Sequence, residues 1–325
     1  MSPPAFPNIV QLAVPAFTLA IAIEVLLIRY AGQKGRYETR DALTSLVMGV
    51  GNVAVGLFLG LASYAFLTWL YGFRIYTIGF EWWAVLVAFV LDDLRYYWAH
   101  RFYHRCRWGW AAHVVHHSSQ HYNLTTALRQ TWTGLLTGVI VLYIPLVLIG
   151  FHPAVLVFVF GVNLVYQFWI HTEVIGRMPR WFEAVMNTPS HHRVHHGTNA
   201  RYLDANYAGV FIVWDRLFGT FVPELTEEPV RYGIVRNLAT FNPLRVAFHE
   251  YVGIVRDIAQ HGLSAKQRLL YIFAPPGWSH DGSRRSTGSI KRDYVLRHPE
   301  EAGAPGLPTP SAGGKRAAAE RPGPA

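Results

Sequence analysis

The chain has 325 residues, of which 51% are hydrophobic and only 15% are charged. This composition is more apolar than that of most soluble domains, so membrane proteins are the first class to consider. The formal net charge is +9, but no basic helix or aromatic platform repeats outside the apolar segments, which argues against a nucleic-acid-binding protein.

Five apolar segments follow one another in the first half of the chain. Residues 10–28, 43–71, 131–150 and 153–171 are each long enough to cross about 30 Å of hydrocarbon as a helix. Residues 79–91 are shorter, but they run directly into a polar sequence, so one long helix can begin in lipid and end above it. The first segment lacks a preceding basic region and a following cleavage site, which favours an anchor over a removed signal peptide.

Lysine and arginine gather after alternate apolar segments. Basic residues are frequent in 29–41, in 95–130 and after residue 172, whereas the other connections carry only Arg74 or none. The positive-inside rule places the basic segments on the cytoplasmic side of a membrane. We therefore expect an all-α, polytopic membrane bundle of about four to five apolar segments, with a cytoplasmic helical cap.

The C-terminal third has a different character. Residues 241–275 form an amphipathic stretch, for which we expect helices. From about residue 280 the chain is rich in Gly, Pro, Ser, Ala and charged residues, and few of its side chains can bury apolar surface. This composition predicts a disordered tail over residues 280–325.

Histidine is concentrated in the middle of the chain, where twelve of the sixteen histidines fall between residues 100 and 196. Eight of them form three sets with helical spacing, and residues three or four apart on a helix share one face. An all-nitrogen donor set suits iron, copper or zinc better than calcium or magnesium. A thiolate zinc site is excluded, because Cys106 is the only cysteine. The three sets are His100 and His104; His113, His116 and His117; and His192, His195 and His196.

Eight imidazoles are too many for one ion. Two ions with about four ligands each would keep open positions for dioxygen or water. The sets follow the ends of apolar segments, where a site can meet both a lipid tail and a soluble reductant. Haem is a rival, but it needs only one or two axial ligands. A zinc carrier or sensor is a different functional class. Transporters, however, place their ligands near the bilayer midplane, whereas these histidines are expected at its edge.

The segment DLRYYWAHRFYHRCRWGWAAHVVHHSSQHYNLTTALRQ, residues 93–130, resembles the fatty acid hydroxylase and sterol desaturase superfamily of membrane di-iron enzymes. The phrases WIHTE, NTPSHHRVHHG, NYAG and WDRLFGTF resemble its alkylglycerol monooxygenase branch in particular. The resemblance covers about residues 85–225. It implies a di-iron catalytic domain over 85–225. The hydropathy pattern on either side predicts N-terminal transmembrane helices over 1–84 and amphipathic C-terminal helices over 226–279.

The resemblance also implies a site and a reaction. The eight histidines above would bind two iron ions, and His171 and His191 match family positions near the centre, where they could be further ligands. The superfamily implies an enzyme of the endoplasmic reticulum or the bacterial inner membrane, with a cytoplasmic catalytic face. The branch implies that dioxygen hydroxylates a lipid beside an ether oxygen, which yields an aldehyde and glycerol. Sterol, carotenoid or fatty-acyl hydroxylases and desaturases are the alternative.

The sequence shows no dinucleotide-binding fingerprint and no fused haem-binding electron donor, so we expect the electrons to come from a separate donor. The alkylglycerol monooxygenase branch implies that this donor is a tetrahydropterin. A separate electron-transfer protein is the alternative.

Three acids are candidates for orienting the imidazoles through their second ring nitrogen. Asp93 lies seven residues before His100 and therefore on the same helical face; the alternative is a helix-end carboxylate that pairs with Arg95 or Arg101. Glu173 follows His171 by two residues, and Asp204 follows the last histidine set. We expect all three near the metal site.

Overall fold

The computed structural model describes residues 6–309. Within that range the chain is helical and has no β-strand, apart from one isolated bridge between Met186 and Phe211, which confirms the predicted all-α class. The α-helices are α1 (Ile9–Tyr30), α2 (Thr39–Tyr71), α3 (Trp82–Arg105), α4 (Arg107–His117), α5 (Ile144–Ile149), α6 (Pro153–Trp169), α7 (Arg180–Val185), α8 (Pro189–His195), α9 (Val213–Leu217), α10 (Pro243–Ile258), α11 (Ala265–Phe273) and α12 (Thr287–Arg297). Short 3₁₀ helices are η1 (Leu124–Leu128), η2 (Gly134–Thr137), η3 (Val139–Tyr143) and η4 (Pro299–Glu301).

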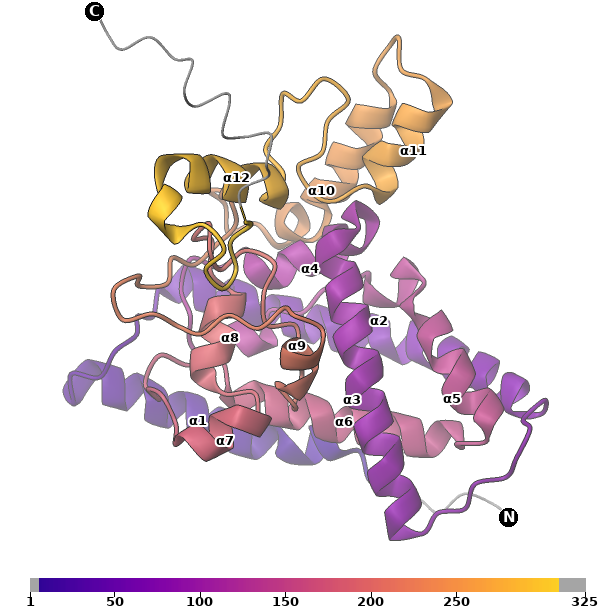
Figure 1. Cartoon of the computed structure of the whole chain (residues 1–325). Coiled ribbons are helices and arrows are strands. Elements are labelled where there is room, and N and C mark those ends of the chain that lie inside the picture. The colour runs from indigo at the N-terminus through magenta and orange to yellow at the C-terminus, as the bar shows by residue number, and fades with distance from the viewer. Residues whose placement is uncertain (1–5, 310–325) are drawn as a thin grey trace, which may run out of the picture.

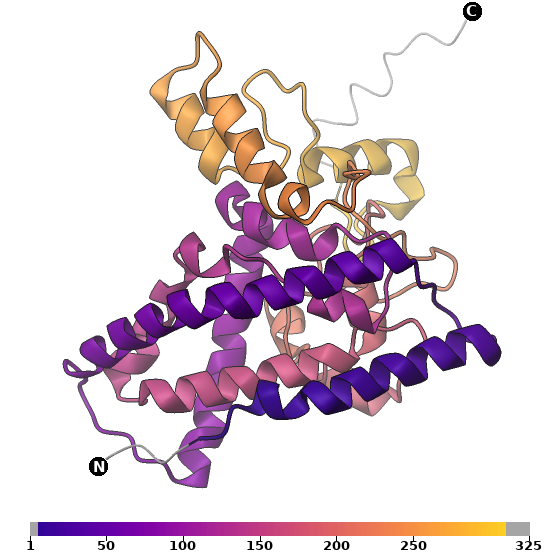
Figure 2. The ribbon, with the colours of Figure 1, turned by 180° about the vertical axis from the view of Figure 1, so that it is seen from behind.

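The helices form a crossed bundle with a cap at one end. Figure 2 shows α1, α2 and α6 running alongside one another, and Figure 1 shows α3 crossing this layer steeply. Helix α3 packs against both α4 and α6. The C-terminal helices α10, α11 and α12 lie together at one end of the molecule (Figures 1 and 2). This arrangement brings the ends of α3, α4 and α6 close to α8.

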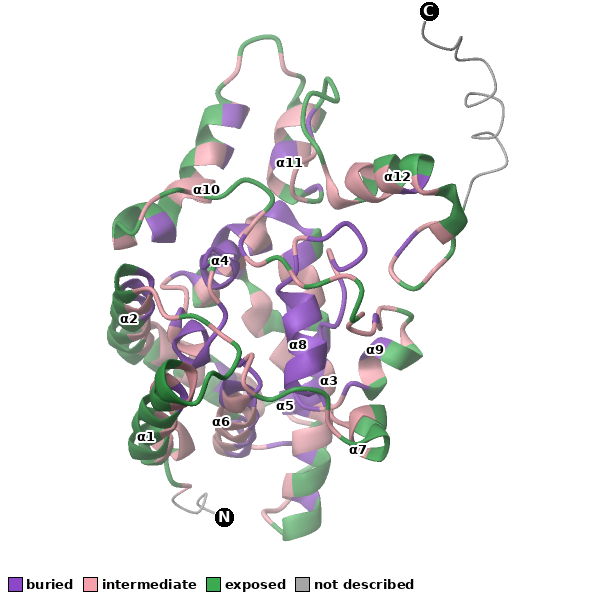
Figure 3. Cartoon of the chain, turned by 90° about the vertical axis from the view of Figure 1, so that its left-hand side faces the viewer, coloured by how far each residue is buried: buried purple, intermediate pink, exposed green. Residues whose placement is uncertain are grey.

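Helices α1 and α2 have 22 and 33 residues and are long and apolar enough to cross a membrane. Their apolar side chains point outward: Leu19 and Leu26 of α1 and Leu57 and Phe58 of α2 are all more than half exposed. Figure 3 shows these exposed faces on one side of the bundle. A lipid-facing surface has this character, because hydrocarbon rather than water covers it.

The prediction of a single spanning helix over 131–150 is wrong. This segment forms η2, η3 and the short α5. Gly138 between η2 and η3 has φ of +87°, a left-handed conformation that interrupts a helix, and Pro145 occupies the first turn of α5. Helix α6 has 17 residues, which gives about 26 Å at 1.5 Å per residue. The number of spans and their orientation therefore remain predictions.

The predicted long helix is present as α3, which is continuous over 24 residues, and the amphipathic stretch forms α10 and α11. The predicted disorder from residue 280 is wrong as far as residue 309. Helix α12 and η4 occupy this part, Val295 and Leu307 are buried, and Glu301 pairs with Arg201. A few apolar contacts and this ion pair suffice to dock the segment. Residues 310–325 of the predicted tail lie outside the described range.

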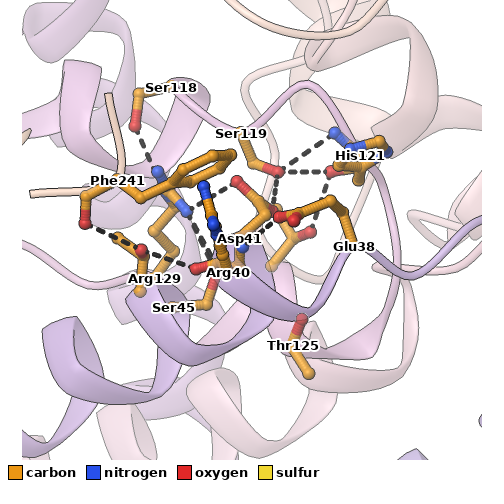
Figure 4. A network of polar contacts seen from close by, with 12 residues as sticks. Glu38, Arg40, Asp41, Ser45, Ser118, Ser119, His121, Thr125, Arg129 and Phe241 are labelled. Atoms are coloured by element: carbon orange, nitrogen blue, oxygen red, sulfur yellow. Dashed lines mark hydrogen bonds and ion pairs between the residues drawn. The ribbon is translucent and has the colours of Figure 1, made fainter. Parts of the chain in front are cut away.

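A buried ion pair ties α2 to the end of α4 (Figure 4). The Arg129 guanidinium is 1% exposed and donates from Nη1 to Asp41 Oδ1 at 3.0 Å and from Nε to Ser118 Oγ at 3.0 Å. Ser119 Oγ donates to the other Asp41 carboxylate oxygen at 2.5 Å. Ser118 directly follows His117, so the network fixes the end of the helix that carries three histidines.

Replacing Arg129 with leucine is expected to lower the free energy of unfolding by about 3–5 kcal/mol, because the Asp41 carboxylate would then be buried without its cation. Chemical denaturation in detergent micelles measures this loss. The double variant Asp41→Leu/Arg129→Leu should lose less than Arg129→Leu alone. An equal or larger loss in the double variant would contradict this account of the pair.

Candidate metal centre

Nine imidazoles meet in two adjoining groups inside the protein. In each group the candidate ligand nitrogens lie within 4.8 Å of one another. The groups touch where the rings of His117 and His196 stack, with centroids 4.3 Å apart. The five-histidine group consists of His100, His104, His113, His117 and His195. The four-histidine group consists of His116, His171, His192 and His196.

Each of the two HxxHH sequences supplies both groups. Residues four apart on an α-helix lie about 40° apart around its axis, whereas the residue three positions on lies about 60° to the other side. Helix α4 therefore sends its first and last histidines into the five-histidine group and His116 into the four-histidine group. Helix α8 and its C-cap residue show the opposite distribution: His192 and His196 lie in the four-histidine group, and His195 lies in the five-histidine group.

Backbone carbonyls fix the ring orientation of three histidines. A carbonyl oxygen only accepts hydrogen bonds, so each Nδ1 that meets one must donate and must leave the Nε2 lone pair free for a metal. In the four-histidine group, His171 Nε2 then lies 3.0 Å from the Nε2 of His192. The three contacts are His100 Nδ1 to Tyr207 O at 2.8 Å, His195 Nδ1 to Ala205 O at 2.9 Å and His171 Nδ1 to Gln167 O at 2.7 Å.

The donor set fits metal ions. Nε2 of His104 and Nε2 of His196 are buried without a hydrogen-bond partner in the described chain, and each belongs to one of the two groups. Burial lowers the pKa of His116 and His192 well below the usual value and that of His171 to about 4. The rings are therefore neutral at pH 7, as metal ligation requires. Nitrogen-only groups of five and four suit iron, copper or zinc.

The carbonyls that orient His100 and His195 lie in a tightly held segment, residues 204–214, here called the support loop. Asp204 and Asn206 adopt left-handed φ values of 55° and 56°, which aspartate and asparagine tolerate better than most residues. Asp215 accepts the backbone N–H groups of Tyr207 and Ala208, both at 2.8 Å. Burial raises the pKa of Asp215 to about 6.

Asp93 has a different position from the one expected. It contacts neither a histidine nor Arg95 or Arg101, and it is fully buried. Instead it binds the far end of the support loop and a side chain of α6. Its oxygens accept from Val210 N, Phe211 N and Trp214 Nε1, each at 2.9 Å, and from Asn163 Nδ2 at 2.8 Å.

Asp204 lies beside the five-histidine group, as predicted from the sequence. Its Oδ1 is 3.4 Å from His104 Nδ1, and its Oδ2 is 3.7 Å from an Arg105 guanidinium nitrogen. The carboxylate can accept the Nδ1 proton of His104 and hold that ring with Nε2 facing the other members of the group.

The variant Asp204→Asn is expected to bind metal about tenfold more weakly. The uncharged amide would orient and polarise the His104 ring less strongly than the carboxylate does. Asparagine tolerates the same backbone conformation, so the fold should persist. Titration of the purified protein with a chelator measures the change. Equal metal retention by Asp204→Asn and the unmodified protein would remove this role.

Two further predicted residues lie outside the groups. Glu173 accepts a hydrogen bond from the Tyr232 hydroxyl at 3.1 Å and contacts no histidine in the described chain. His191 belongs to neither group, and its Nε2 is 3.9 Å from Glu183 Oε2. His171, by contrast, belongs to the four-histidine group.

Two acids outside the predicted set of site residues support the two histidine groups. Asp215 accepts hydrogen bonds from the backbone of the support loop. Its position in the family phrase WDRLFGTF was the only sequence feature that could have indicated this role. Glu24 of α1 is buried and accepts from Leu124 N at 2.9 Å and from Thr172 Oγ1 at 2.5 Å. Thr172 follows His171, so Glu24 connects α1 to the four-histidine group. An acid within an apolar helix was the only sequence signal for it.

Comparison with known proteins places this centre inside a recognised domain. Residues 85–220 match the family model "Fatty acid hydroxylase". Alkylglycerol monooxygenase of Homo sapiens is 40% identical over 277 residues, which cover 84% of this chain and 60% of that protein. The protein of the same name from Caenorhabditis elegans is 31% identical, covering 79% of this chain and 52% of that protein.

A bacterial relative is more distant. The ornithine lipid hydroxylase OlsE of Rhizobium tropici is 28% identical over 137 residues, 42% of this chain and 41% of that protein. No solved structure matches the chain. The chain thus spans about 60% of the vertebrate alkylglycerol monooxygenases that it matches.

Proposed function

We propose that this chain, whose residues 85–220 match the fatty acid hydroxylase family model, is a membrane monooxygenase that uses dioxygen and two iron ions to cleave alkylglycerol ether lipids. The carbon beside the ether oxygen is hydroxylated, and the resulting hemiacetal separates into a fatty aldehyde and glycerol. One oxygen atom enters the lipid, and the other leaves as water with two electrons and two protons. The identity to alkylglycerol monooxygenases over most of this chain favours this substrate.

The observation that carries the proposal is the adjacency of the two histidine groups. The five-histidine group would hold one iron ion and the four-histidine group the other. When bound, a pair of reduced iron ions supplies the activation of dioxygen that no side chain provides. The chain itself contributes neutral, oriented imidazoles. It also contributes a largely water-free environment, because eight of the nine rings are buried.

His113 is the remaining ring and is partly exposed. It stacks on Tyr103 with centroids 5.4 Å apart, and the Tyr103 hydroxyl reaches Thr137 of η2 at 3.4 Å. The lipid chain would approach the five-histidine group from this side, beside the apolar segment that contains η2 and η3. Its reacting carbon then needs to be held only a few ångströms from the metals.

Electrons would come from a tetrahydropterin or from a separate electron-transfer protein. The site would face the cytoplasm from a bacterial inner membrane or the endoplasmic reticulum, which the basic segments around it support. Helices α1 and α2 would anchor the chain in the bilayer.

Metal analysis combined with lipid mass spectrometry tests the proposal. The full chain, purified from iron-replete cells, is expected to contain about two iron ions and to convert an alkylglycerol to aldehyde and glycerol when given tetrahydropterin or a reductase. Unchanged ether lipids together with hydroxylated sterols, carotenoids or acyl chains would show that the enzyme acts on one of these other lipids. A chain that contains only zinc after iron-replete expression would favour a carrier or sensor and would overturn the proposal that the chain is an enzyme.

A further inference from the structure

The start of α8 borders a cavity that shares no residue with either histidine group. This cavity of about 570 Å³ is bordered by α7, the start of α8, α9 and residues 221–224. Three arginines line it: Arg177, Arg180 and Arg216. Ser190 and His191 of α8 line it as well. His191 was a candidate metal ligand in the sequence, yet the structure places it in this cavity and in neither histidine group.

The arginines of this cavity lack carboxylate partners. No ion pair of Arg177, Arg180 or Arg216 occurs in the described part of the chain. Arg177 donates to the backbone carbonyl of Glu224. Arg216 donates to the carbonyl of Glu183 at 3.1 Å and lies over the Phe221 ring, 3.8 Å from its centroid. Most of the guanidinium donors therefore remain available to a ligand.

The two acids at the cavity already have partners of their own. Glu224 forms a paired interaction with Arg193, at 2.9 and 2.7 Å. Glu183 Oε1 accepts from Met178 N, Thr188 Oγ1 and Ser190 Oγ. With Glu224 already paired to Arg193, the three exposed arginines outnumber the one remaining carboxylate, Glu183, and this excess of positive charge favours an anion.

His191 gives a second and independent indication of a ligand. The side chain is 3% exposed, and its Nδ1 is buried without a hydrogen-bond partner among the described residues. Its Nε2 is 3.9 Å from Glu183 Oε2, which is too far for a hydrogen bond. A buried ring nitrogen without a hydrogen-bond partner costs stability unless a ligand completes it.

Apolar side chains line part of the cavity, among them Met178, Phe221 and Pro223, and others are exposed on the neighbouring faces of α7 and α9. Trp181 and Val185 of α7 are 75% and 46% exposed, and Leu217 of α9 is 67% exposed. Figure 3 shows the exposed parts of α7 and α9 on the same side of the molecule. Arginines next to exposed tryptophan and leucine are typical of surfaces that bind phospholipid, because headgroup and chain are recognised together.

We propose that Arg177, Arg180, Arg216 and His191 form a phosphate-binding pocket that takes the headgroup phosphate of an anionic phospholipid. Planar guanidinium groups pair with two phosphate oxygens at once, which makes arginine a frequent phosphate ligand. The pocket would hold α7 and α9 on the membrane surface, next to the helix that carries His192 and His195. It does not depend on the proposed reaction.

Binding of short-chain lipids to the full, metal-loaded chain in detergent tests this site. Dihexanoyl phosphatidic acid should bind about tenfold more tightly to the unmodified chain than to Arg180→Gln or Arg216→Gln, since each variant loses one charge-assisted contact. The control Arg245→Gln, an exposed arginine on α10, should bind like the unmodified chain. Melting curves without lipid verify that the variants fold.

Two further probes separate the possible sources of the phosphate. Dihexanoylglycerol, which lacks the phosphate, should bind at least about tenfold more weakly than the phosphatidic acid. Inorganic phosphate should also bind more weakly, because it has no acyl chains to contact the exposed apolar side chains of α7 and α9. Equal binding of inorganic phosphate and the lipid would overturn the lipid assignment. Unchanged phosphatidic acid binding by both pocket variants would overturn the site, whatever the enzymatic activity.

Discussion

Replacing His195 with alanine is expected to release the metal of the five-histidine group and to lower aldehyde formation from an alkylglycerol by about 100-fold or more. His195 is buried, its Nδ1 donates to Ala205 O at 2.9 Å, and its Nε2 is 3.1 Å from that of His117. Alanine removes one ligand and leaves a cavity that other side chains cannot fill. Iron per chain and product formation are the two measurements.

The exposed His261 provides a matched control. His261→Ala should keep both the iron and the activity, because this ring lies outside both groups. His192→Ala tests the other half of the centre and should lower the iron content from about two ions to about one. Full activity and full iron content in His195→Ala would remove that residue from the centre.

Histidine spacing predicted much of this centre because helical periodicity determines direction. All eight histidines in the three predicted sets lie in the two groups. His191 shows the limit of this reasoning. It is four residues before His195, so the helix places the two rings about 40° apart. Spacing alone could not exclude it, and only packing reveals that its ring lies beside Glu183 and belongs to neither histidine group.

A shared helical face does not by itself place two residues close together. Asp93 shares the face of His100, as expected, but seven residues correspond to about 10.5 Å of rise. That separation is too large for a hydrogen bond to the ring, and the carboxylate meets the support loop instead. The support loop lies more than 100 positions after α3 in the sequence, yet the two segments are in contact. No local pattern in one sequence indicates such a contact.

Hydropathy has a similar limit. The segment 131–150 is apolar enough to span a membrane, yet Gly138 and Pro145 divide it into short turns. The tail has few apolar residues, yet Val295 and Leu307 are buried. Average composition therefore predicted where apolar surface is abundant, but single residues decided where helices end and which segments dock.

The variant Asp93→Ala is expected to lower the free energy of unfolding by about 3–5 kcal/mol and to reduce the iron content as well. Four donors would lose their acceptor in the interior: two backbone N–H groups of the support loop, the Trp214 indole and the Asn163 amide. Gly209 packs so closely that an added Cβ would lie 2.8 Å from Asp93 Oδ1. The loop therefore has little freedom to find other partners.

Loss of metal should accompany this loss of stability because the support loop also carries the Ala205 and Tyr207 carbonyls that orient His195 and His100. Asp93→Asn keeps one oxygen and should lose about half as much stability. Glu227→Ala, an exposed acid, should change neither stability nor iron content. Denaturant titration and iron analysis of the three variants separate the two effects: if Asp93→Ala unfolds more easily but retains all of its iron, Asp93 stabilises the fold without positioning the ligands.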